Sequence, residues 1–479
     1  MHVAIVGAGI AGLYAGLLLR REGHQVTIYE RTPRVGGRIF THHFTSPGAS
    51  KDAFFEAGAM RIPRSRLHSR VFEMIDYLNE TGTKSNRIKL IPYELLGNDQ
   101  AFFHGRKRSR SDHEWTAEAD LPSGFRGKSA EELLQSVVRP WVELLLEDFE
   151  AGFAELLQYD ELSFREYLRQ HAKWPSEVID YVELFCSQTN QYHLSFTDII
   201  MQCVDFGTKN VSYHFTLTEA HSKISQWTTI EGGMSRLPER AASLIGFQNI
   251  ILSAEVIDLV DLKSGSVEIR AKSPSGIIGG IYDTVILAIP PQAVQRIPRR
   301  PQWSPQKEQA IRSIHFQPLY KMGLHFKTRF WEHFSLKPRL GGQDSTDLRF
   351  RWIIYPSNGV GSSGSGVLLV YCWMEDAGRF SMLSKQDRLN VVLCDLARFF
   401  ADECDFDILE DFIEAADVSW AQTCYGGDAM FLPGQFRRHF EVARGAEGGV
   451  YFAGEHLSRH HTWVCLSLLD WNWNWIGMC

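Results

Sequence analysis

The sequence lacks the features that mark membrane, disulfide-rich and nucleic-acid-binding proteins. It contains no run of about eighteen uncharged apolar residues, so it predicts no membrane span. Its eight cysteines are scattered without a Cys-x-x-Cys pair, which disfavours a disulfide framework or a zinc site and suits a reducing compartment. The net charge of −7 gives no reason to expect a nucleic-acid partner.

The sequence also leaves little space for a targeting segment. The first apolar strand begins at residue 2, where no signal peptide fits ahead of it, so we expect a cytoplasmic protein. The basic run Arg106–Arg110 is better explained as a solvated loop than as a nuclear address. At 479 residues the chain is too long for one core, and two or three domains are expected.

The first thirty residues carry the order of elements that a dinucleotide-binding fold needs. The pattern comprises a buried strand at His2–Val6, a turn at Gly7–Gly12, a helix at Leu13–Arg20, a strand at Gln25–Tyr29 and an acid, Glu30. A strand, a glycine turn, a helix, a second strand and an acid in this order predict a nucleotide site at the helix N-terminus.

Each glycine of this turn has a separate physical role. Gly7 permits the tight turn. Gly9 has no side chain, so the pyrophosphate can approach the backbone closely. Gly12 lets the helix pack close to the sheet. Glu30 can accept hydrogen bonds from both ribose hydroxyls, which disfavours a 2′-phosphate. The predicted contacts in this part of the chain are Gly7, Gly9, Ile10, Ala11, Gly12, Glu30 and Arg31.

A second glycine motif distinguishes FAD from NAD. Gly36-Gly37-Arg38 follows Glu30 and resembles the second phosphate contact of glutathione-reductase-type flavoproteins, above all of the flavin amine oxidases. The resemblance implies FAD, with Gly37 and Arg38 as further contacts. In monoamine oxidases a cysteine near a later glycine pair bonds the flavin. Here Cys424 precedes the pair and Asp428 follows it, so we expect non-covalent FAD.

The segment Phe54–Pro63 resembles the corresponding motif of L-amino-acid oxidases, including those of snake venoms and fungi. The resemblance implies that Gly58, Ala59 and Met60 pass beside the isoalloxazine and that Arg61 binds the substrate carboxylate. A guanidinium suits this task because it can bind a carboxylate through two parallel hydrogen bonds. The alternative for Arg61 is a surface ion pair.

Two residues of the predicted substrate domain match the same family. Lys321 lies in Leu319–Phe326, which alternates like a strand. The resemblance implies a buried lysine that holds a water near flavin N5, and the alternative is a surface lysine with a buried stem. Tyr371 matches the tyrosine whose hydroxyl helps to bind the carboxylate, and its alternative is a core aromatic.

The resemblance assigns the remaining cofactor and substrate contacts. Val256, in a predicted strand over Ile250–Leu259, is expected to contact adenine through its backbone. A second strand is predicted over Tyr282–Ile289. Gly454 and Glu455 are expected beside the ribityl chain. The expected contacts near the C-terminus are the carbonyl of Thr462 for the substrate amine, Trp463 as an aromatic wall and catalytic positioning residue, and Val464 at the flavin. His456, His460 and His461 as metal ligands are disfavoured, because the flavin motif explains the segment.

The chain departs from the family after Val464. Small residues that open a helix are absent there, and bulky residues from Cys465 to Trp475 take their place. We therefore expect a short or distorted final helix, weak FAD retention and poor solubility.

The predicted fold is α/β, with a glutathione-reductase-type FAD-binding Rossmann domain, a mixed-sheet substrate domain and a helical insertion. The expected FAD-binding parts are 1–63, 228–309 and 431–479, with a helical domain at 64–227 and a substrate domain at 310–430. Helical spacing is clear at Val71–Leu78, Glu131–Leu157 and Ser163–Arg169, whereas the polar stretch Phe102–Lys128 predicts a long loop.

The resemblance implies FAD-dependent oxidation of an L-amino acid by O₂ to a 2-oxo acid, ammonia and hydrogen peroxide. Because only a neutral amine releases a hydride, activity should rise with pH. The alternatives are a monoamine or polyamine oxidase, a decarboxylating amino-acid monooxygenase and an inactive flavin-binding protein. A homodimer is a further expectation. Aromatic or long aliphatic substrates are the default, but Asp428, expected at the side-chain end of the pocket, would favour a cationic side chain.

Overall fold

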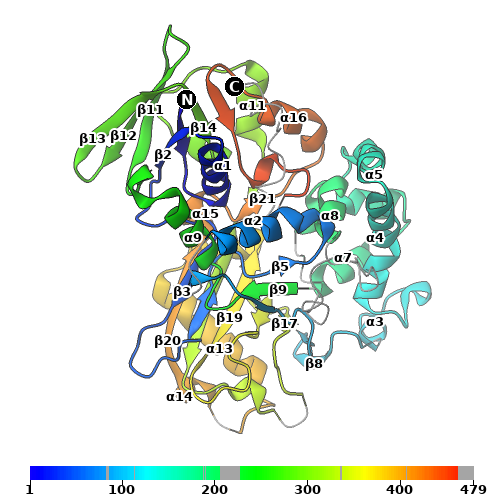
Figure 1. Cartoon of the computed structure of the whole chain (residues 1–479). Coiled ribbons are helices and arrows are strands. Elements are labelled where there is room, and N and C mark those ends of the chain that lie inside the picture. The colour runs from blue at the N-terminus through cyan, green and yellow to red at the C-terminus, as the bar shows by residue number, and fades with distance from the viewer. Residues whose placement is uncertain are drawn as a thin grey trace.

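The computed structural model describes residues 1–81, 86–112, 114–186, 188, 190–204, 227–334, 337–405 and 407–461. Thr462, Trp463, Val464 and the tail after them lie outside the described residues, so the expectations for them stay predictions. Figure 1 shows three regions: a sheet with helices at the top, a second sheet at the bottom and a group of helices at the right.

The upper region is built on a five-stranded parallel sheet in the order β10-β2-β1-β14-β22. Its strands are β1 His2–Val6, β2 Gln25–Tyr29, β10 Ile250–Ile251, β14 Thr284–Leu287 and β22 Val450–Phe452. The two predicted strands at the N-terminus are confirmed. The sheet therefore joins three segments that lie far apart in the sequence, as a Rossmann domain interrupted by insertions requires.

Both faces of this sheet are covered by apolar residues. One face packs against α1 Ile10–Arg21 and α9 Arg236–Ile245. The other packs against the antiparallel sheet of β11 Glu255–Asp261, β12 Val267–Ser273 and β13 Gly276–Tyr282. Burial on both faces explains why β1 and β14 read as apolar runs without alternation.

Two strand predictions and one helix prediction were wrong in extent. The segment Ile250–Leu259 is two strands, β10 and β11, because Ser253 takes a positive φ of 54° and turns the chain between two sheets. The segment Tyr282–Ile289 is also divided, since β13 ends at Tyr282 and β14 begins at Thr284. The predicted helix Glu131–Leu157 is two helices, α4 Ala130–Glu147 and α5 Phe149–Leu156, because Asp148 leaves the helical region and accepts a hydrogen bond from Ala151 N.

The lower region is a seven-stranded mixed sheet in the order β20-β16-β19-β18-β17-β7-β8. Its strands are β20 Phe412–Ser419, β16 Leu319–Phe326, β19 Gly366–Trp373, β18 Trp352–Ile354, β17 Gln343–Thr346, β7 Gln100–Phe103 and β8 Arg106–Ser109. The helices α12 Met374–Ser381 and α13 Lys385–Phe400 cover one face.

The predicted loop at Phe102–Lys128 was wrong, because its start forms the hairpin of β7 and β8. The four residues of β7 are buried, and Asp344 Oδ1 accepts a hydrogen bond from Gln100 N at 2.6 Å. β7 pairs in parallel with β17, about 240 residues later in the chain. Local polarity outside the short apolar run Ala101–Phe103 concealed this long-range pairing.

The helical region on the right of Figure 1 has its own apolar core. Its helices are α3 Glu114–Glu118, α4 Ala130–Glu147, α5 Phe149–Leu156, α6 Phe164–Gln170, α7 Ser176–Phe185 and α8 Phe196–Cys203. Ser129 and Ser163 form capping boxes at α4 and α6, which fix where these helices begin. By contrast, α2 Ser69–Glu80 packs into the core of the upper region. The exact domain limits stay a prediction.

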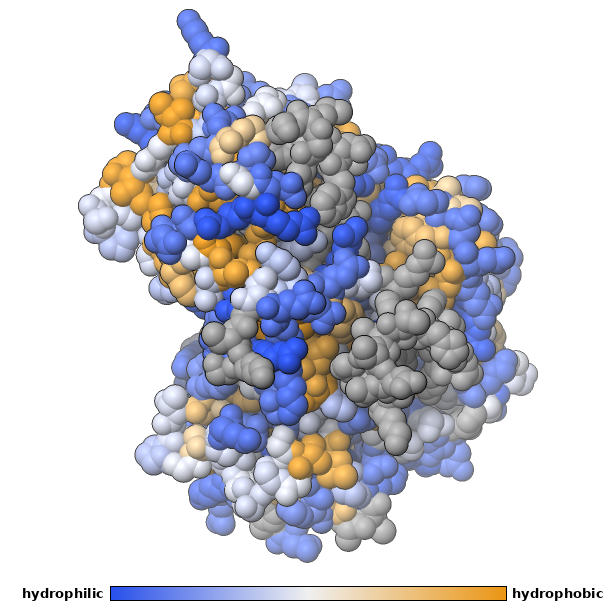
Figure 2. Space-filling view, in the orientation of Figure 1, coloured by the Kyte–Doolittle hydropathy of each residue, from blue (hydrophilic) through white to orange (hydrophobic). Residues whose placement is uncertain are grey.

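The remaining elements are short connections. They are β3 Thr41–His43, β4 Phe54–Glu56, β5 Ile62–Pro63, β6 Leu90–Pro92, β9 Trp227–Ile230, β15 Phe316–Gln317, β21 Asp428–Ala429, α10 Pro291–Gln295, α11 Pro305–Ser313, α14 Ile408–Asp411, α15 Trp420–Cys424 and α16 Glu441–Arg444. No helix within the described ranges has the length and apolarity that crossing a membrane requires. The face in Figure 2 is mostly hydrophilic, with apolar patches over the β11–β13 sheet, where Ile277 and Ile281 are exposed.

A substitution in the first turn tests the upper region. A Cβ added at Gly12 would lie 2.0 Å from the carbonyl oxygen of Gly7, so the helix and the strand would have to separate. We expect Gly12→Ala to destabilise the fold by about 1–3 kcal/mol, read as a lower thermal midpoint. Gly378→Ala is the matched control, because no atom lies within 4 Å of its added Cβ. Equal midpoints for both variants would contradict this packing.

Candidate active site

The glycine turn at the start of α1 leaves one open space beside the backbone. A Cβ at Gly7 would lie 2.6 Å from Ala288 O, and Gly7 has a φ of 105°. A Cβ at Gly9, in contrast, would meet no atom within 4 Å. No side chain caps α1, and no acid lies in its first turn. The open position and the uncapped helix N-terminus fit the pyrophosphate of a dinucleotide.

Glu30 ties the end of β2 to the glycine turn and to β11. Its Oε2 accepts a hydrogen bond from Ala8 N at 2.8 Å, and its Oε1 accepts one from Thr32 N at 2.9 Å. The carbonyl of Glu30 accepts from Ala254 N at 2.8 Å, two residues before Val256. The arrangement suits a ribose and adenine, although these contacts stay predictions.

The side chain of Arg38 joins two further segments to the turn. Its Nη1 donates to Glu455 Oε1 at 2.8 Å and to the carbonyl of Gly427 at 3.0 Å. Burial acts to raise the pKa of Glu455, but Arg38, His456 and His461 together outweigh it and hold that pKa below its ordinary value. A Cβ at Gly37 would lie 3.2 Å from the Cα of Gly9, so the two glycine motifs are in contact.

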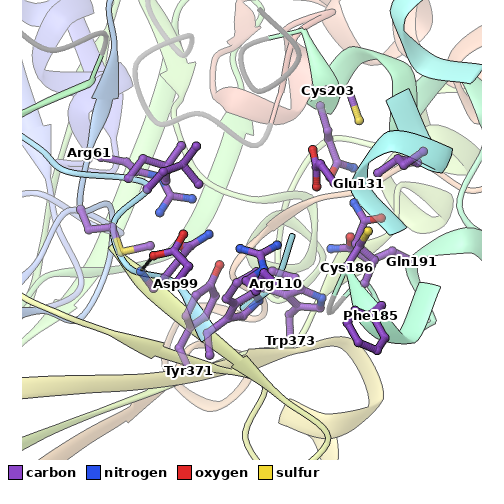
Figure 3. A pocket seen from close by; sticks show the side chains of 18 of the residues that line it. Arg61, Asp99, Arg110, Glu131, Phe185, Cys186, Gln191, Cys203, Tyr371 and Trp373 are labelled. Atoms are coloured by element: carbon purple, nitrogen blue, oxygen red, sulfur yellow. Dashed lines mark hydrogen bonds between the residues drawn. The ribbon is translucent and has the colours of Figure 1, made fainter. Parts of the chain in front are cut away.

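A cavity of about 770 Å³ lies between the two sheets and the helices. Figure 3 shows Arg61 and Tyr371 at one side and Glu131, Gln191 and Cys186, from the helical region, at the other. This volume suits a small organic ligand. The lining includes these predicted site residues: Arg38, Gly58, Ala59, Met60, Arg61, Lys321, Tyr371 and Asp428.

Arg61 follows a backbone segment that is held from several sides. Trp420 Nε1 donates to the carbonyl of Ala57 at 2.6 Å, and Ala59 N donates to the carbonyl of Arg38 at 3.1 Å. A Cβ at Gly58 would lie 1.9 Å from that same Arg38 oxygen, so only glycine fits there. These contacts fix the backbone that carries the guanidinium.

The guanidinium of Arg61 lies among aromatic side chains. It is 5.7 Å from the ring centre of Tyr93 and 5.6 Å from that of Trp227. It also lies near the Tyr371 hydroxyl, on whose pKa it acts. Burial raises the pKa of Tyr371, while Arg61 opposes the rise, so the hydroxyl stays protonated and can donate. A cation and a hydroxyl donor at one cavity wall are suited to a carboxylate.

The alternation of two strands places Lys321 and Tyr371 together. The two residues are direct partners in the antiparallel pairing of β16 with β19, so their side chains share one face. Met322 and Val370, the next residues, point into the core on the other face. Lys321 is 3% exposed, and its Nζ donates to Gly58 O at 2.6 Å. The surface-lysine alternative is therefore wrong, and the water near flavin N5 stays a prediction.

Asp428 lines the cavity near these residues. Its Oδ1 accepts a hydrogen bond from Gln317 Nε2 at 2.7 Å. Burial, with the nearby Glu455 as a second cause, raises the pKa of Asp428 to about 7. At neutral pH the carboxyl group is therefore present in both its charged and its neutral form.

Other predicted contacts have partners of their own. Arg31 donates from Nη2 to the carbonyl of Thr423 at 2.7 Å, so its contact with the cofactor stays a prediction. His461 pairs with Asp198 of α8, and Gln202 Nε2 also donates to Asp198, at 2.6 Å. No group of metal ligands exists among the residues that the structure describes.

No sequence pattern pointed to several of the residues that line the cavity. Gln317 and Trp373 are the last residues of β15 and β19, strands that pair over long distances in the sequence. The wall from α4, α7 and α8 includes Glu131, Phe185 and Cys203, which read as ordinary helix residues. Only the packing of the helical region against the sheets shows that they face a cavity.

Comparison with known proteins agrees with this geometry. The profile of the flavin containing amine oxidoreductase family matches residues 10–464. The chain belongs to this family. An L-amino-acid oxidase of Naja atra is 29% identical, over 97% of this chain and 85% of that protein. A Dictyostelium discoideum protein that carries the name bifunctional amine oxidase is 30% identical over 98% of this chain, which spans 45% of its length.

Solved structures support the fold. Putrescine oxidase bound to putrescine superposes with a TM-score of 0.73 at 19% identity, covering 98% of this chain and 97% of that one. The α/β architecture of a flavin amine oxidase, with helices and mixed sheets, is thereby confirmed. Membership in this family implies a flavin cofactor, and the open turn at Gly9 fits its pyrophosphate.

The open turn gives a test of cofactor binding in this amine oxidoreductase. Gly9→Ala adds a Cβ that meets no protein atom within 4 Å, so the fold should keep its thermal midpoint in the flavin-free state. Because the pyrophosphate needs that space, the affinity for FAD should fall at least about tenfold. The measurement is FAD titration by fluorescence. Unchanged affinity would place the phosphates elsewhere.

The buried lysine gives a test by pH. Burial, with Arg61 as a second cause, lowers the pKa of Lys321 from 10.5 to about 7. Between these values the unfolded chain binds a proton that the folded chain does not. The free energy of unfolding of the wild type, relative to that of Lys321→Met, therefore rises with pH in this window by at most about 1.4 kcal/mol per pH unit. Thermal midpoints of both proteins from about pH 7 to about pH 9 measure this difference, and parallel curves would contradict it.

Proposed function

We propose that this flavoprotein catalyses the FAD-dependent oxidative deamination of an L-amino acid. The products are a 2-oxo acid, ammonia and hydrogen peroxide, with O₂ as the oxidant. The observation that carries the proposal is the pair of Arg61 and Tyr371 at the cavity wall, where the guanidinium and the hydroxyl can hold a carboxylate. The relative from Naja atra is named an L-amino-acid oxidase.

The residues of the chain mainly orient the substrate. When bound, FAD supplies the two-electron oxidation of the carbon–nitrogen bond. Arg61 and Tyr371 hold the carboxylate, which fixes the position of the α-carbon relative to the segment Gly58–Met60. Lys321 lies beneath this segment through its hydrogen bond to Gly58 O. We propose that it holds a water there, and that Thr462 and Trp463 position the amine.

An amine oxidase is the second candidate, because the solved relative in the comparison binds putrescine, which has no carboxylate. An amine substrate would leave Arg61 without a role in binding. A decarboxylating monooxygenase would share the carboxylate site, and the release of peroxide with a 2-oxo acid separates it from an oxidase. Non-covalent FAD, a homodimer and a cytoplasmic location stay predictions from the sequence.

Arg61→Lys tests the carboxylate site. The lysine keeps the charge but loses the two parallel donors, so KM for the best L-amino acid should rise about 10- to 100-fold, while the FAD content stays the same. Arg299→Lys is the matched control, because the Arg299 side chain is 65% exposed and lies outside the cavity. Equal KM values for Arg61→Lys and wild type would remove Arg61 from substrate binding.

A further inference from the structure

Asp428 is a carboxylate in the cavity wall that has only a neutral partner. Gln317 Nε2 donates to its Oδ1, and Asp428 forms no ion pair within the described part of the chain. Because a buried carboxylate without a cation is costly, such a position favours a positively charged ligand.

The surroundings of Asp428 carry an excess of negative charge. Arg38 is the nearby guanidinium, but it already donates to Glu455 and to the carbonyl of Gly427. Glu455 acts on Asp428 as a second carboxylate. One guanidinium thus lies beside two carboxylates at this wall, and the other nearby cation, Lys321, has its pKa lowered to about 7. A bound cation would restore the balance.

Gln317 gives a second, independent observation that points to a ligand at this wall. The side chain lines the cavity and is 2% exposed. Its Nε2 donates a hydrogen bond to Asp428. Its Oε1 is a buried oxygen without a hydrogen-bond partner among the described residues. Buried acceptors are normally satisfied, so a donor is expected beside this amide. An ammonium group can supply several donors at once.

The reacting amine is a poor match for this wall. Oxidation needs a neutral amine, whereas a neighbouring carboxylate stabilises the protonated form. A second, non-reacting cation in the substrate has no such conflict. Arg61 and Asp428 both act electrostatically on Lys321 and on Tyr371, so both lie within reach of one small molecule.

We propose that Asp428 and Gln317 form a subsite for a cationic substrate side chain, so that the enzyme prefers basic L-amino acids to neutral ones of equal length. The inference rests on the proposed function, because it takes Arg61 as the site of the α-carboxylate. It departs from the aromatic or aliphatic preference that the family resemblance implies.

A binding experiment separates the subsite from the chemistry. Hexanoate and 6-aminohexanoate both lack the α-amine and differ only in the terminal ammonium. In calorimetric titrations of the FAD-loaded protein without oxygen, 6-aminohexanoate should bind about 100-fold more tightly than hexanoate. Asp428→Asn should reduce this ratio to within about threefold and leave the affinity for hexanoate unchanged. Equal affinities in the wild type would overturn the subsite.

The same comparison, of a cationic side chain with a neutral one, applies to the turnover of substrates. The ratio of kcat/KM for L-lysine to that for L-norleucine should exceed about 30 and fall to near one in Asp428→Asn. Glu131→Gln is the matched control, since it removes one exposed carboxylate from the helical wall of the same cavity, across from Arg61 (Figure 3), and should leave the ratio within about threefold of the wild type.

Each other outcome overturns a defined part of the account. An equal loss for both substrates in Asp428→Asn would place Asp428 at the reacting amine. A ratio that moves only in Glu131→Gln would place cation recognition on the helical wall. Oxidation of norleucine with no preference for lysine would end the subsite but not the proposed function. Oxidation of no amino acid, with no binding of hexanoate, would end the proposed function itself.

Discussion

The segment Ala57–Arg61 is the constraint on which the site depends, because three parts of the chain hold its backbone. Trp420 and Lys321 donate to its carbonyls from the lower region, and its own amide donates to Arg38 of the upper region. The absence of a side chain at Gly58 permits this close approach. The guanidinium of Arg61 is therefore positioned by the contact between two sheets that fold from distant parts of the sequence.

Charge in the cavity follows from the same contacts. Lys321 is buried beside Arg61, and both effects lower its pKa to about 7, which limits the positive charge near the carboxylate site. Asp428 is buried beside Glu455, and both effects raise its pKa to about 7. The charged residues that line the cavity thus include two, Lys321 and Asp428, whose charge a ligand can change. Its selectivity depends on how these groups respond to the substrate.

Local sequence patterns predicted those parts of the fold that depend on contacts between residues close together in the sequence. The glycines at positions 7 and 12 act as expected, since the turn and the helix packing are properties of a short segment. The pairing of β7 with β17 and the partner of Asp428 were not predicted. Both depend on contacts between residues more than a hundred positions apart. Lys321 was expected to be buried only through resemblance, and the pairing with Tyr371 in the sheet supplies the physical reason.

The central claim is that the cavity recognises a carboxylate beside the reacting amine. It is tested most directly by comparing an L-amino acid with the amine that remains when its carboxylate is removed, such as L-leucine with 3-methylbutylamine. The measurement is the rate of flavin reduction without oxygen, followed by absorbance. The account predicts a second-order rate constant at least about 100-fold larger for the amino acid. An equal or larger constant for the amine would contradict it.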